Sequence, residues 1–295
     1  FYDEDGKVEN KLAEEENKWG STILKINRGE VLTANDIKNI REFTAYQISR
    51  TKAMLAHNQD MVTTILTDVL YNRNSDLNKS VINEMVEKKV ESEITSEYNL
   101  DFVNDILSTI DDLKMIILEN KTDIAFFTSD VPVIIVNPLG IHRAGLGDIG
   151  TVVFFPISQK KMVMFYDSKL YGKIAEEIQD SECIYTFNKY QYVSADERIL
   201  ALNSIEFEKF IQDKELNAFR EKFHVSAKTT TSYDGIGTFM AAKSRSIEYY
   251  LDIPILKLPK SLKKIPRDFR ETFPRNYNFK TRRAILCRVY REPDF

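Results

Sequence analysis

The sequence predicts an α+β protein with a helical N-terminal half packed on a small antiparallel sheet, followed by further helices and a basic C-terminal extension. Three observations lead to this fold class. Apolar residues recur every three or four positions up to about Asn120, which is the period of core-facing helices. Beyond Asn120 the period shortens towards two, which is typical of strands. The segment from Lys257 to Phe295 combines prolines with an excess of basic side chains.

Four helices are expected in the N-terminal half. Their predicted ranges are Val8 to Ile26, Ala34 to Leu70, Asp76 to Ile94 and Asn99 to Glu119. Thr33 precedes the second helix, and its hydroxyl suits the N-cap position because it can accept a bond from a first-turn N–H.

Strands and further helices are expected in the second half. The predicted strands are 124–128, 131–136, 151–157, 161–166 and 184–187, and the predicted helices are 168–179, 189–202 and 205–223. The short turn at 158–160 predicts an antiparallel hairpin between two of these strands. The polar stretch 226–237 is expected to be a loop.

Two regions are expected from this pattern, an α+β domain at residues 1–225 and a basic extension at 226–295. The segment Lys257 to Phe295 carries a net charge of +8, and the remainder of the chain carries −12. This asymmetry has two interpretations: the extension folds back onto an acidic body, or it engages a polyanion such as nucleic acid or another protein partner.

An apolar run from Phe126 to Pro138 is interrupted by Ser129 and Asp130. Burying such groups without partners costs free energy, so they form either a turn or a site. In a site, Asp130 would orient a histidine, bind a divalent cation or accept a proton. Ser129 fits an acyl nucleophile poorly, because no Gly-x-Ser-x-Gly elbow surrounds it.

Three further polar residues fall on apolar helix faces: Glu16 on the first helix, and Gln47 and Arg50 on the second. We expect Glu16 and Arg50 to contact each other or to share a partner. One interpretation is a structural ion pair between the two helices. The other is a pocket in which Arg50 holds an anionic group, Gln47 orients it, and Glu16 acts as a base or metal ligand.

The remaining motifs indicate little chemistry. Residues 145–150 spell G-x-G-x-x-G, but a strand is expected to follow, so no helix N-terminus would receive a pyrophosphate. His57 lies seven residues after Arg50 and would therefore share its side of a continuous helix. No spacing typical of a zinc site involves the three histidines or the two cysteines.

The composition indicates the cellular compartment and the source of the protein. Two distant cysteines argue against a disulfide framework and favour a reducing cytoplasm. The aliphatic runs are far shorter than the roughly 20 residues of a membrane span. The many Lys, Asn, Ile and Glu residues suggest a bacterial protein, and because the chain opens at Phe1 without a methionine, we expect it to lack an upstream segment.

Several short motifs resemble one protein family in their order and spacing. They are Phe1-Tyr2, Leu12 to Asn17, Gln47 to Thr51, Phe127 to Val133 and Phe154 to Ser158. Together they span about Phe1 to Ser204 and resemble the bacterial family grouped as domain of unknown function 4238. Members usually begin with a His-Tyr-Val-Pro segment that is absent here, so its histidine has no counterpart in this chain. The resemblance implies a fold and candidate positions, with no established activity.

Two functions are therefore expected as alternatives. The first is a hydrolase-like cytoplasmic enzyme that acts on an anionic, phosphodiester-type substrate. Its site residues would be Glu16, Ser129 and Asp130 for catalysis and Gln47 and Arg50 for substrate binding, with a divalent cation as the candidate cofactor. The second is a non-catalytic binding or regulatory module in which these residues are structural and the extension engages nucleic acid or a protein partner.

Overall fold

The computed structural model describes residues 7–73, 78–139, 145–223, 228–233, 238–243, 251–258 and 275. The chain divides into two compact units. The first, Phe1–Leu107 with Arg220–Ser246, is called the helical unit here. The second, Ser108–Phe219 with Ile247–Phe295, is called the sheet unit. The α+β class predicted from the sequence is confirmed.

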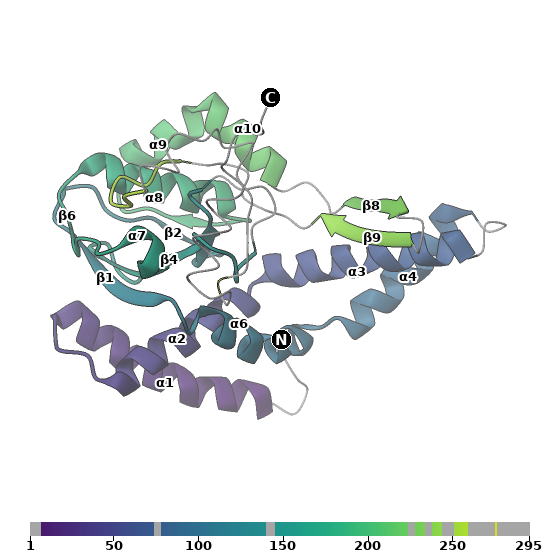
Figure 1. Cartoon of the computed structure of the whole chain (residues 1–295), viewed down its shortest axis with the longest axis horizontal. Coiled ribbons are helices and arrows are strands. Elements are labelled where there is room, and N and C mark those ends of the chain that lie inside the picture. The colour runs from purple at the N-terminus through teal and green to yellow at the C-terminus, as the bar shows by residue number, and fades with distance from the viewer. Residues whose placement is uncertain are drawn as a thin grey trace, which may run out of the picture. The chain divides into compact units, whose positions relative to one another are not determined.

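The helical unit opens with the helix pair α1 (Lys7–Arg28) and α2 (Ala34–Ser49), drawn in purple in Figure 1. Gly29 ends α1 with φ 73°, which suits glycine. Its N–H donates to the Ile26 carbonyl while the Glu30 N–H donates to the Lys25 carbonyl, the paired bonds of a Schellman cap. Thr33 caps α2 as expected.

The predicted long helix from Ala34 to Leu70 is wrong, because it is divided into α2 and α3 (Lys52–Arg73). Arg50 caps the end of α2, and the Thr51 hydroxyl accepts a bond from the Met54 N–H at the start of α3. A threonine side chain that bonds nearby backbone in this way favours a helix start over a helix interior. The i+7 argument that placed His57 beside Arg50 therefore fails.

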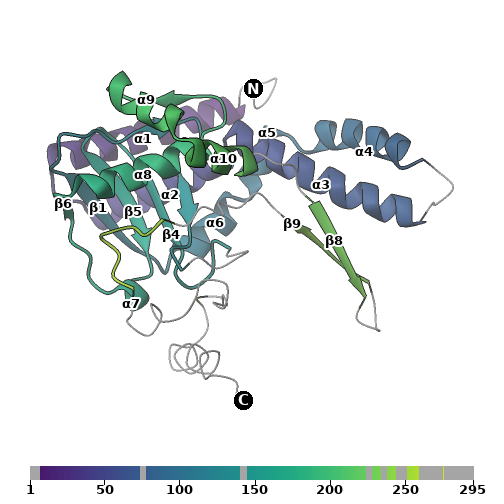
Figure 2. The same ribbon diagram turned by 90° about the horizontal axis from the view of Figure 1, so that it is seen from above.

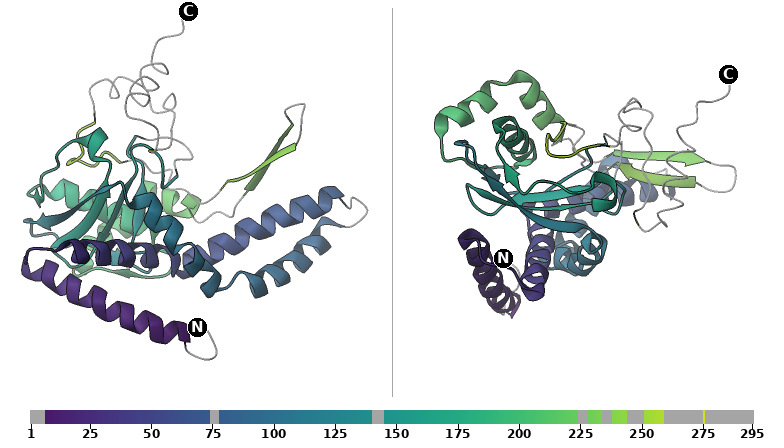
Figure 3. Two further views of the ribbon diagram at one scale, coloured as in Figure 1. Left: turned by 60° about the horizontal axis from the view of Figure 1, so that its bottom comes forward. Right: turned by 60° about the vertical axis from the view of Figure 1, so that its left-hand side comes forward.

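α4 (Lys79–Glu93) packs against α3 and buries an apolar stripe at helical spacing. The buried residues are Ile82, Val86, Val90 and Ile94. The backbone of β8 (Lys228–Tyr233) and β9 (Thr238–Lys243) forms an antiparallel hairpin beside α3 (Figure 3). The loop expected at 226–237 is thus a strand at 228–233.

The predicted helix from Asn99 to Glu119 is also wrong. The chain forms α5 (Ser96–Asp101), α6 (Val103–Ile110) and then the strand β1 (Lys114–Asn120). β1 lies inside the sheet and pairs with strands on both sides. Every second residue of β1 is buried, namely Ile116, Leu118 and Asn120. The 3.6-residue pattern of the preceding helix concealed this alternation.

The main sheet of the sheet unit has the strand order β3-β4-β5-β1-β6. Its other strands are β3 (Ile134–Val136), β4 (Val152–Pro156), β5 (Lys161–Tyr166) and β6 (Glu177–Ile178). β4 and β5 form the predicted hairpin, with Phe154 opposite Met164. The expected antiparallel sheet is mixed, because β6 runs parallel to β1.

Helix α8 (Ser181–Ser194) lies over one face of this sheet (Figure 2). Its Phe187 packs edge-on against Phe154 and Phe126, and the three rings form part of the main apolar core. The strand predicted at 184–187 and the helix predicted at 189–202 are therefore wrong. Asp180 caps a single helix that begins earlier, and α7 (Ser168–Tyr171) ends at Gly172 instead of reaching 179.

The remaining elements are short. β2 (Thr128–Ser129) pairs antiparallel with β7 (Ile199–Leu200), and α9 (Ser204–Gln212) and α10 (Lys214–Phe223) replace the single helix predicted at 205–223. Asp213 separates these two helices. Most of the basic segment from Lys257 to Phe295 lies outside the described residues. Among the described residues, no helix is long and apolar enough to cross a membrane.

Candidate functional site

Glu16 and Arg50 form the contact that the sequence predicts. Arg50 Nη1 donates to Glu16 Oε1 at 2.6 Å, and Arg50 Nε donates to Gln47 Oε1 at 3.3 Å. The Arg50 side chain is 25% exposed and that of Glu16 is 52% exposed. The pair therefore sits at the rim of the α1–α2 interface, where solvent weakens the interaction between the charges.

An aromatic layer follows along the same interface. Trp19, one turn after Glu16 on α1, is fully buried. Its ring centroid lies 5.5 Å from that of Phe43 and 4.9 Å from that of Tyr46. The Glu16–Arg50 pair is thus adjacent to an apolar contact between the two helices, as expected of a residue pair that fixes their register.

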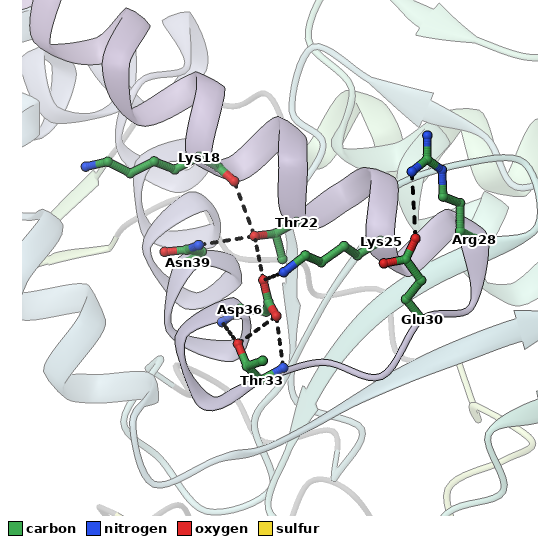
Figure 4. A network of polar contacts seen from close by, with 8 residues as sticks. All are labelled: Lys18, Thr22, Lys25, Arg28, Glu30, Thr33, Asp36 and Asn39. Carbon is green, nitrogen blue, oxygen red and sulfur yellow. Dashed lines mark hydrogen bonds and ion pairs between the residues drawn. The ribbon is translucent and has the colours of Figure 1, made fainter.

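A second polar contact lies at the other end of the interface and is centred on Asp36 (Figure 4). Lys25 Nζ donates to Asp36 Oδ1 at 2.8 Å, and Thr33 donates to Asp36 Oδ2 through its N–H at 2.9 Å and its hydroxyl at 2.7 Å. Bonds from Lys25 and then from Thr33 hold the pKa of Asp36 well below its usual range.

Thr22 extends this network across the helix pair. Its hydroxyl oxygen accepts a bond from Asn39 Nδ2 at 3.1 Å and lies 3.4 Å from Asp36 Oδ1 (Figure 4). Sequence reasoning identified Thr33 as a cap but did not identify Asp36. The spacing of an acidic residue three positions after the N-cap is a capping-box signal that would have found it.

Ser129 is buried and bonded within the sheet unit. Its hydroxyl lies 2.9 Å from Gln191 Oε1 and 3.0 Å from the Val131 carbonyl, and it accepts the Val131 N–H at 3.2 Å. Gln191 in turn donates to the Pro132 carbonyl at 2.7 Å. These contacts close a turn after β2, and the Ser129 hydroxyl has no bond to a histidine base among the described residues.

Asp130 caps a neighbouring backbone segment. Oδ1 accepts the Asp196 N–H at 3.0 Å, and Oδ2 accepts the N–H groups of Glu197 at 2.7 Å and Arg198 at 3.0 Å. The Asp130 N–H donates back to the Arg198 carbonyl. The carboxylate therefore organises the turn between α8 and β7, which agrees with the turn interpretation of this stretch.

Asn188 is a structural residue that sequence reasoning missed. It is fully buried on α8, accepts the Phe127 N–H at 2.8 Å and donates to the Ala125 carbonyl at 2.9 Å. Asn188 and Gln191 thus supply hydrogen bonds to the extended segment before and after β2. A polar residue between the apolar residues Phe187 and Tyr190 of the buried face of α8 was the available signal.

In the glycine motif at residues 145–150, Gly150 adopts a backbone conformation that favours glycine. Gly150 has φ 85°, and a Cβ there would lie 2.6 Å from Leu139 Cδ1. Its carbonyl accepts a bond from the Tyr171 hydroxyl at 2.7 Å. As the sequence predicts, strand β4 follows directly. His142 and His224 lie outside the described residues, and His57 belongs to α3.

The described residues contain no group of three or more His, Cys, Asp or Glu side chains that could hold a metal ion. Cys183 belongs to the main apolar core, and burial raises the pKa of its thiol to about 12. Cys183 therefore fits an apolar core residue better than a nucleophile or a metal ligand.

A groove of about 350 Å³ opens in the sheet unit beside the β4–β5 turn. Among the described residues, its lining contains no charged side chain. The lining residues are Phe126, Thr128, Pro156, Ile157, Ser158, Gln159, Leu200, Ala201 and Leu202. Leu200 and Leu202 are each 68% exposed. This is a concave, neutral and largely apolar surface.

The five predicted site residues fall into two sets. Arg50 bonds both Glu16 and Gln47 in the helical unit. Ser129 and Asp130 are in the sheet unit, where each has its own partners. Whether the two sets serve one catalytic site stays a prediction.

No curated protein and no solved structure matches the chain. One family model matches residues 1–204, and its description is "Protein of unknown function (DUF4238)". The match covers the α1–α2 pair and the sheet with α8. The chain belongs to the DUF4238 family.

Proposed function

We propose that this protein is a non-catalytic binding module whose partner is another protein. The observation that carries the proposal is the hydrogen bonding of Ser129 and Asp130. Both side chains bond to the chain's own backbone, and Ser129 also bonds to Gln191, so they stabilise the turns around β2 and β7. A nucleophile or general base needs a lone pair directed at a substrate.

The groove beside the β4–β5 turn supplies a binding surface. An anionic substrate would need cationic groups or a helix N-terminus, and the described residues that line the groove carry no charge. Leu200 and Leu202 expose apolar area at its rim. An uncharged apolar segment of a partner protein matches this chemistry, since its burial there removes apolar surface from water.

Arg275, the one arginine of the C-terminal extension among the described residues, is not available to bind a nucleic-acid phosphate. Arg275 is buried and paired with Asp112, so its charge is neutralised within the sheet unit. A phosphate-binding arginine would keep its guanidinium accessible.

Peptide selection tests the proposal. A random peptide library is selected on the full chain, and the affinity of the resulting peptides is measured by fluorescence anisotropy. We expect apolar peptides whose affinity falls at least tenfold in Leu200→Asp and in Leu202→Asp. Ile211→Asp is the matched control, because Ile211 is half exposed in the same unit but does not line the groove. Failure to select a peptide, or equal binding to all variants, would contradict the proposal.

A hydrolysis assay tests the enzymatic alternative. The full chain is incubated with a chromogenic phosphodiester in the presence of Mg²⁺ or Mn²⁺. We expect no turnover above that of a heat-denatured sample. Turnover that disappears in Asp130→Asn while the circular dichroism spectrum is unchanged would establish the hydrolase function instead.

A further inference from the structure

Arg275 lies beyond residues 1–204, which the family model matches, and its side chain is held by several hydrogen bonds to the sheet unit. Its side chain is 3% exposed. Nε donates to Asp112 Oδ1 at 3.1 Å and Oδ2 at 3.2 Å, and Nη2 lies 3.1 Å from Asp112 Oδ1. Nη1 donates to the Leu146 carbonyl at 2.6 Å and the Asp148 carbonyl at 3.0 Å. Nη2 also donates to the Thr109 carbonyl.

The arrangement satisfies every donor of the guanidinium. An arginine carries five N–H groups in a fixed plane, two on each Nη and one on Nε. Here the acceptors are one carboxylate, which faces Nε and Nη2, and three backbone carbonyls, of which one faces Nη2 and two face Nη1. The backbone of the same residue is also held, because the Arg275 N–H donates to the Gly147 carbonyl at 2.8 Å.

We propose that Thr109, Asp112 and residues 146–148 form a guanidinium-binding site, and that Arg275 is its built-in ligand, which anchors the C-terminal extension to the sheet unit. The acceptors come from elements that are separate in the sequence: the end of α6, the turn before β1 and the glycine loop before β4. The geometry selects guanidinium over ammonium, since a lysine nitrogen has three donors at one point and cannot reach acceptors on both sides.

Chemical rescue tests this site. Arg275→Ala in the full chain removes the ligand and leaves the acceptors. Addition of guanidinium chloride at about 1–50 mM, far below denaturing concentrations, is expected to raise its melting temperature in a saturable way. The wild type, whose site is filled, should show no such increase. Methylammonium chloride at the same concentrations should not replace guanidinium, and Arg275→Lys should melt close to Arg275→Ala.

Controls separate the site from general salt effects. The double variant Asp112→Ala/Arg275→Ala lacks the carboxylate and should show no rescue. Arg28→Ala removes an exposed guanidinium in the helical unit, and guanidinium should not change its melting temperature. The proposal is overturned if guanidinium fails to stabilise Arg275→Ala, or if methylammonium or the double variant behaves identically.

A second measurement applies if Arg275→Ala does not fold. Asp112→Asn keeps Arg275 but replaces the carboxylate that accepts its Nε–H with an uncharged amide. Exchange of the Arg275 Nε proton with solvent, followed by NMR, should be at least tenfold faster in Asp112→Asn than in the wild type. Asp111→Asn, at the exposed neighbouring position, should leave the rate unchanged. Equal exchange rates in all three chains would overturn the proposal.

Discussion

Arg50 Nη1 lies 2.6 Å from Glu16 Oε1, and this ion pair joins α1 to α2 at one end of their interface. The contact agrees with the sequence prediction. Its surroundings are those of an interhelical pair, because Gln47 bonds the same guanidinium and the Trp19 layer follows on the inner side. We therefore expect the pair to contribute to the stability of the helix pair.

A double-mutant cycle measures this contribution. Glu16→Ala, Arg50→Ala and the double variant are unfolded in urea, and the coupling free energy should be about 0.5–1 kcal/mol, since the pair is partly exposed. The coupling should weaken in about 1 M NaCl because salt screens exposed charges. Glu14→Ala, at an exposed position on α1, should show no coupling to Arg50→Ala. A coupling of zero would show that the ion pair does not contribute to the free energy of unfolding.

Asp36 should make the stability dependent on pH. Its folded-state pKa is depressed, first by the bond from Lys25 and then by those from Thr33. Below the ordinary carboxyl pKa of about 4, the unfolded state binds the proton more readily than the folded state does. The stabilising contribution is therefore complete above about pH 4 and is lost as the pH falls further.

Urea unfolding of the wild type and Asp36→Asn between about pH 7 and pH 3 tests this expectation. The free energy difference between the two proteins should be constant near neutrality and should shrink below about pH 4. Lys25→Met, which removes the largest cause of the shift, should show a shallower pH dependence than the wild type. Parallel curves for the wild type and Asp36→Asn would contradict a depressed pKa.

The sequence could predict those parts of the fold that depend on neighbouring residues. Thr33 as a cap and the β4–β5 hairpin follow from local spacing, and Glu16 and Arg50 were each placed by the apolar face of their own helix. The path of β1 could not be predicted in this way. Its apolar run suits a helix or a buried strand, and pairing with β5, more than forty positions later in the sequence, decides between them.

The polar interior of the sheet unit was less predictable for a related reason. Asn188 and Gln191 bond backbone groups 61 and 59 positions away, at Phe127 and Pro132. No local pattern identifies such partners. The apolar residues of α8 were interpreted as a strand because this helix is buried over most of its surface, so the contrast between an apolar and a polar face is small.

Three glycines should respond differently to alanine. Gly20, in α1, has no neighbouring atom close to the place that an alanine methyl group would take, so Gly20→Ala should stabilise the protein by about 0.5–1 kcal/mol. Gly172 also has space but a φ of 71°, and Gly172→Ala should destabilise the protein by about 1–2 kcal/mol. Gly150→Ala combines a φ of 85° with the contact to Leu139 and should cost more than Gly172→Ala.

Urea unfolding of the three variants gives this order directly. It distinguishes backbone strain from the steric contact, because only Gly150 has both. If Gly150→Ala were no more destabilising than Gly172→Ala, Leu139 would have to move aside at little cost. The Leu139→Ala/Gly150→Ala double variant should then show no coupling between the two positions.

Cys183 should be inert in the folded protein. Its thiol is fully buried, and burial raises its pKa to about 12, so the thiol is protonated at pH 8. In a Cys287→Ser chain, iodoacetamide should therefore label Cys183 only as fast as the protein unfolds. Mass spectrometry follows the labelling, and complete reaction in denaturant is the control. Rapid labelling without unfolding would show that the thiol is accessible.

Asp130 distinguishes the structural from the catalytic interpretation of the Ser129–Asp130 turn. Its carboxylate accepts three backbone N–H groups from residues 196–198, so Asp130→Ala leaves these donors without their acceptor. We expect a loss of about 1–3 kcal/mol in the free energy of unfolding, with a smaller loss for Asp130→Asn, which keeps one oxygen.

Asp123→Ala is the matched control for this prediction, because Asp123 is an exposed aspartate in the same unit and its loss should change stability by less than about 0.5 kcal/mol. Urea unfolding compares the three variants with the wild type. Hydrogen exchange should also show faster exchange at the amides of Asp196, Glu197 and Arg198 in Asp130→Ala, since these lose a bonded acceptor. If Asp130→Ala were as stable and as protected as Asp123→Ala, the carboxylate would have no structural function. A direct role in binding or catalysis would then be the better explanation of this residue.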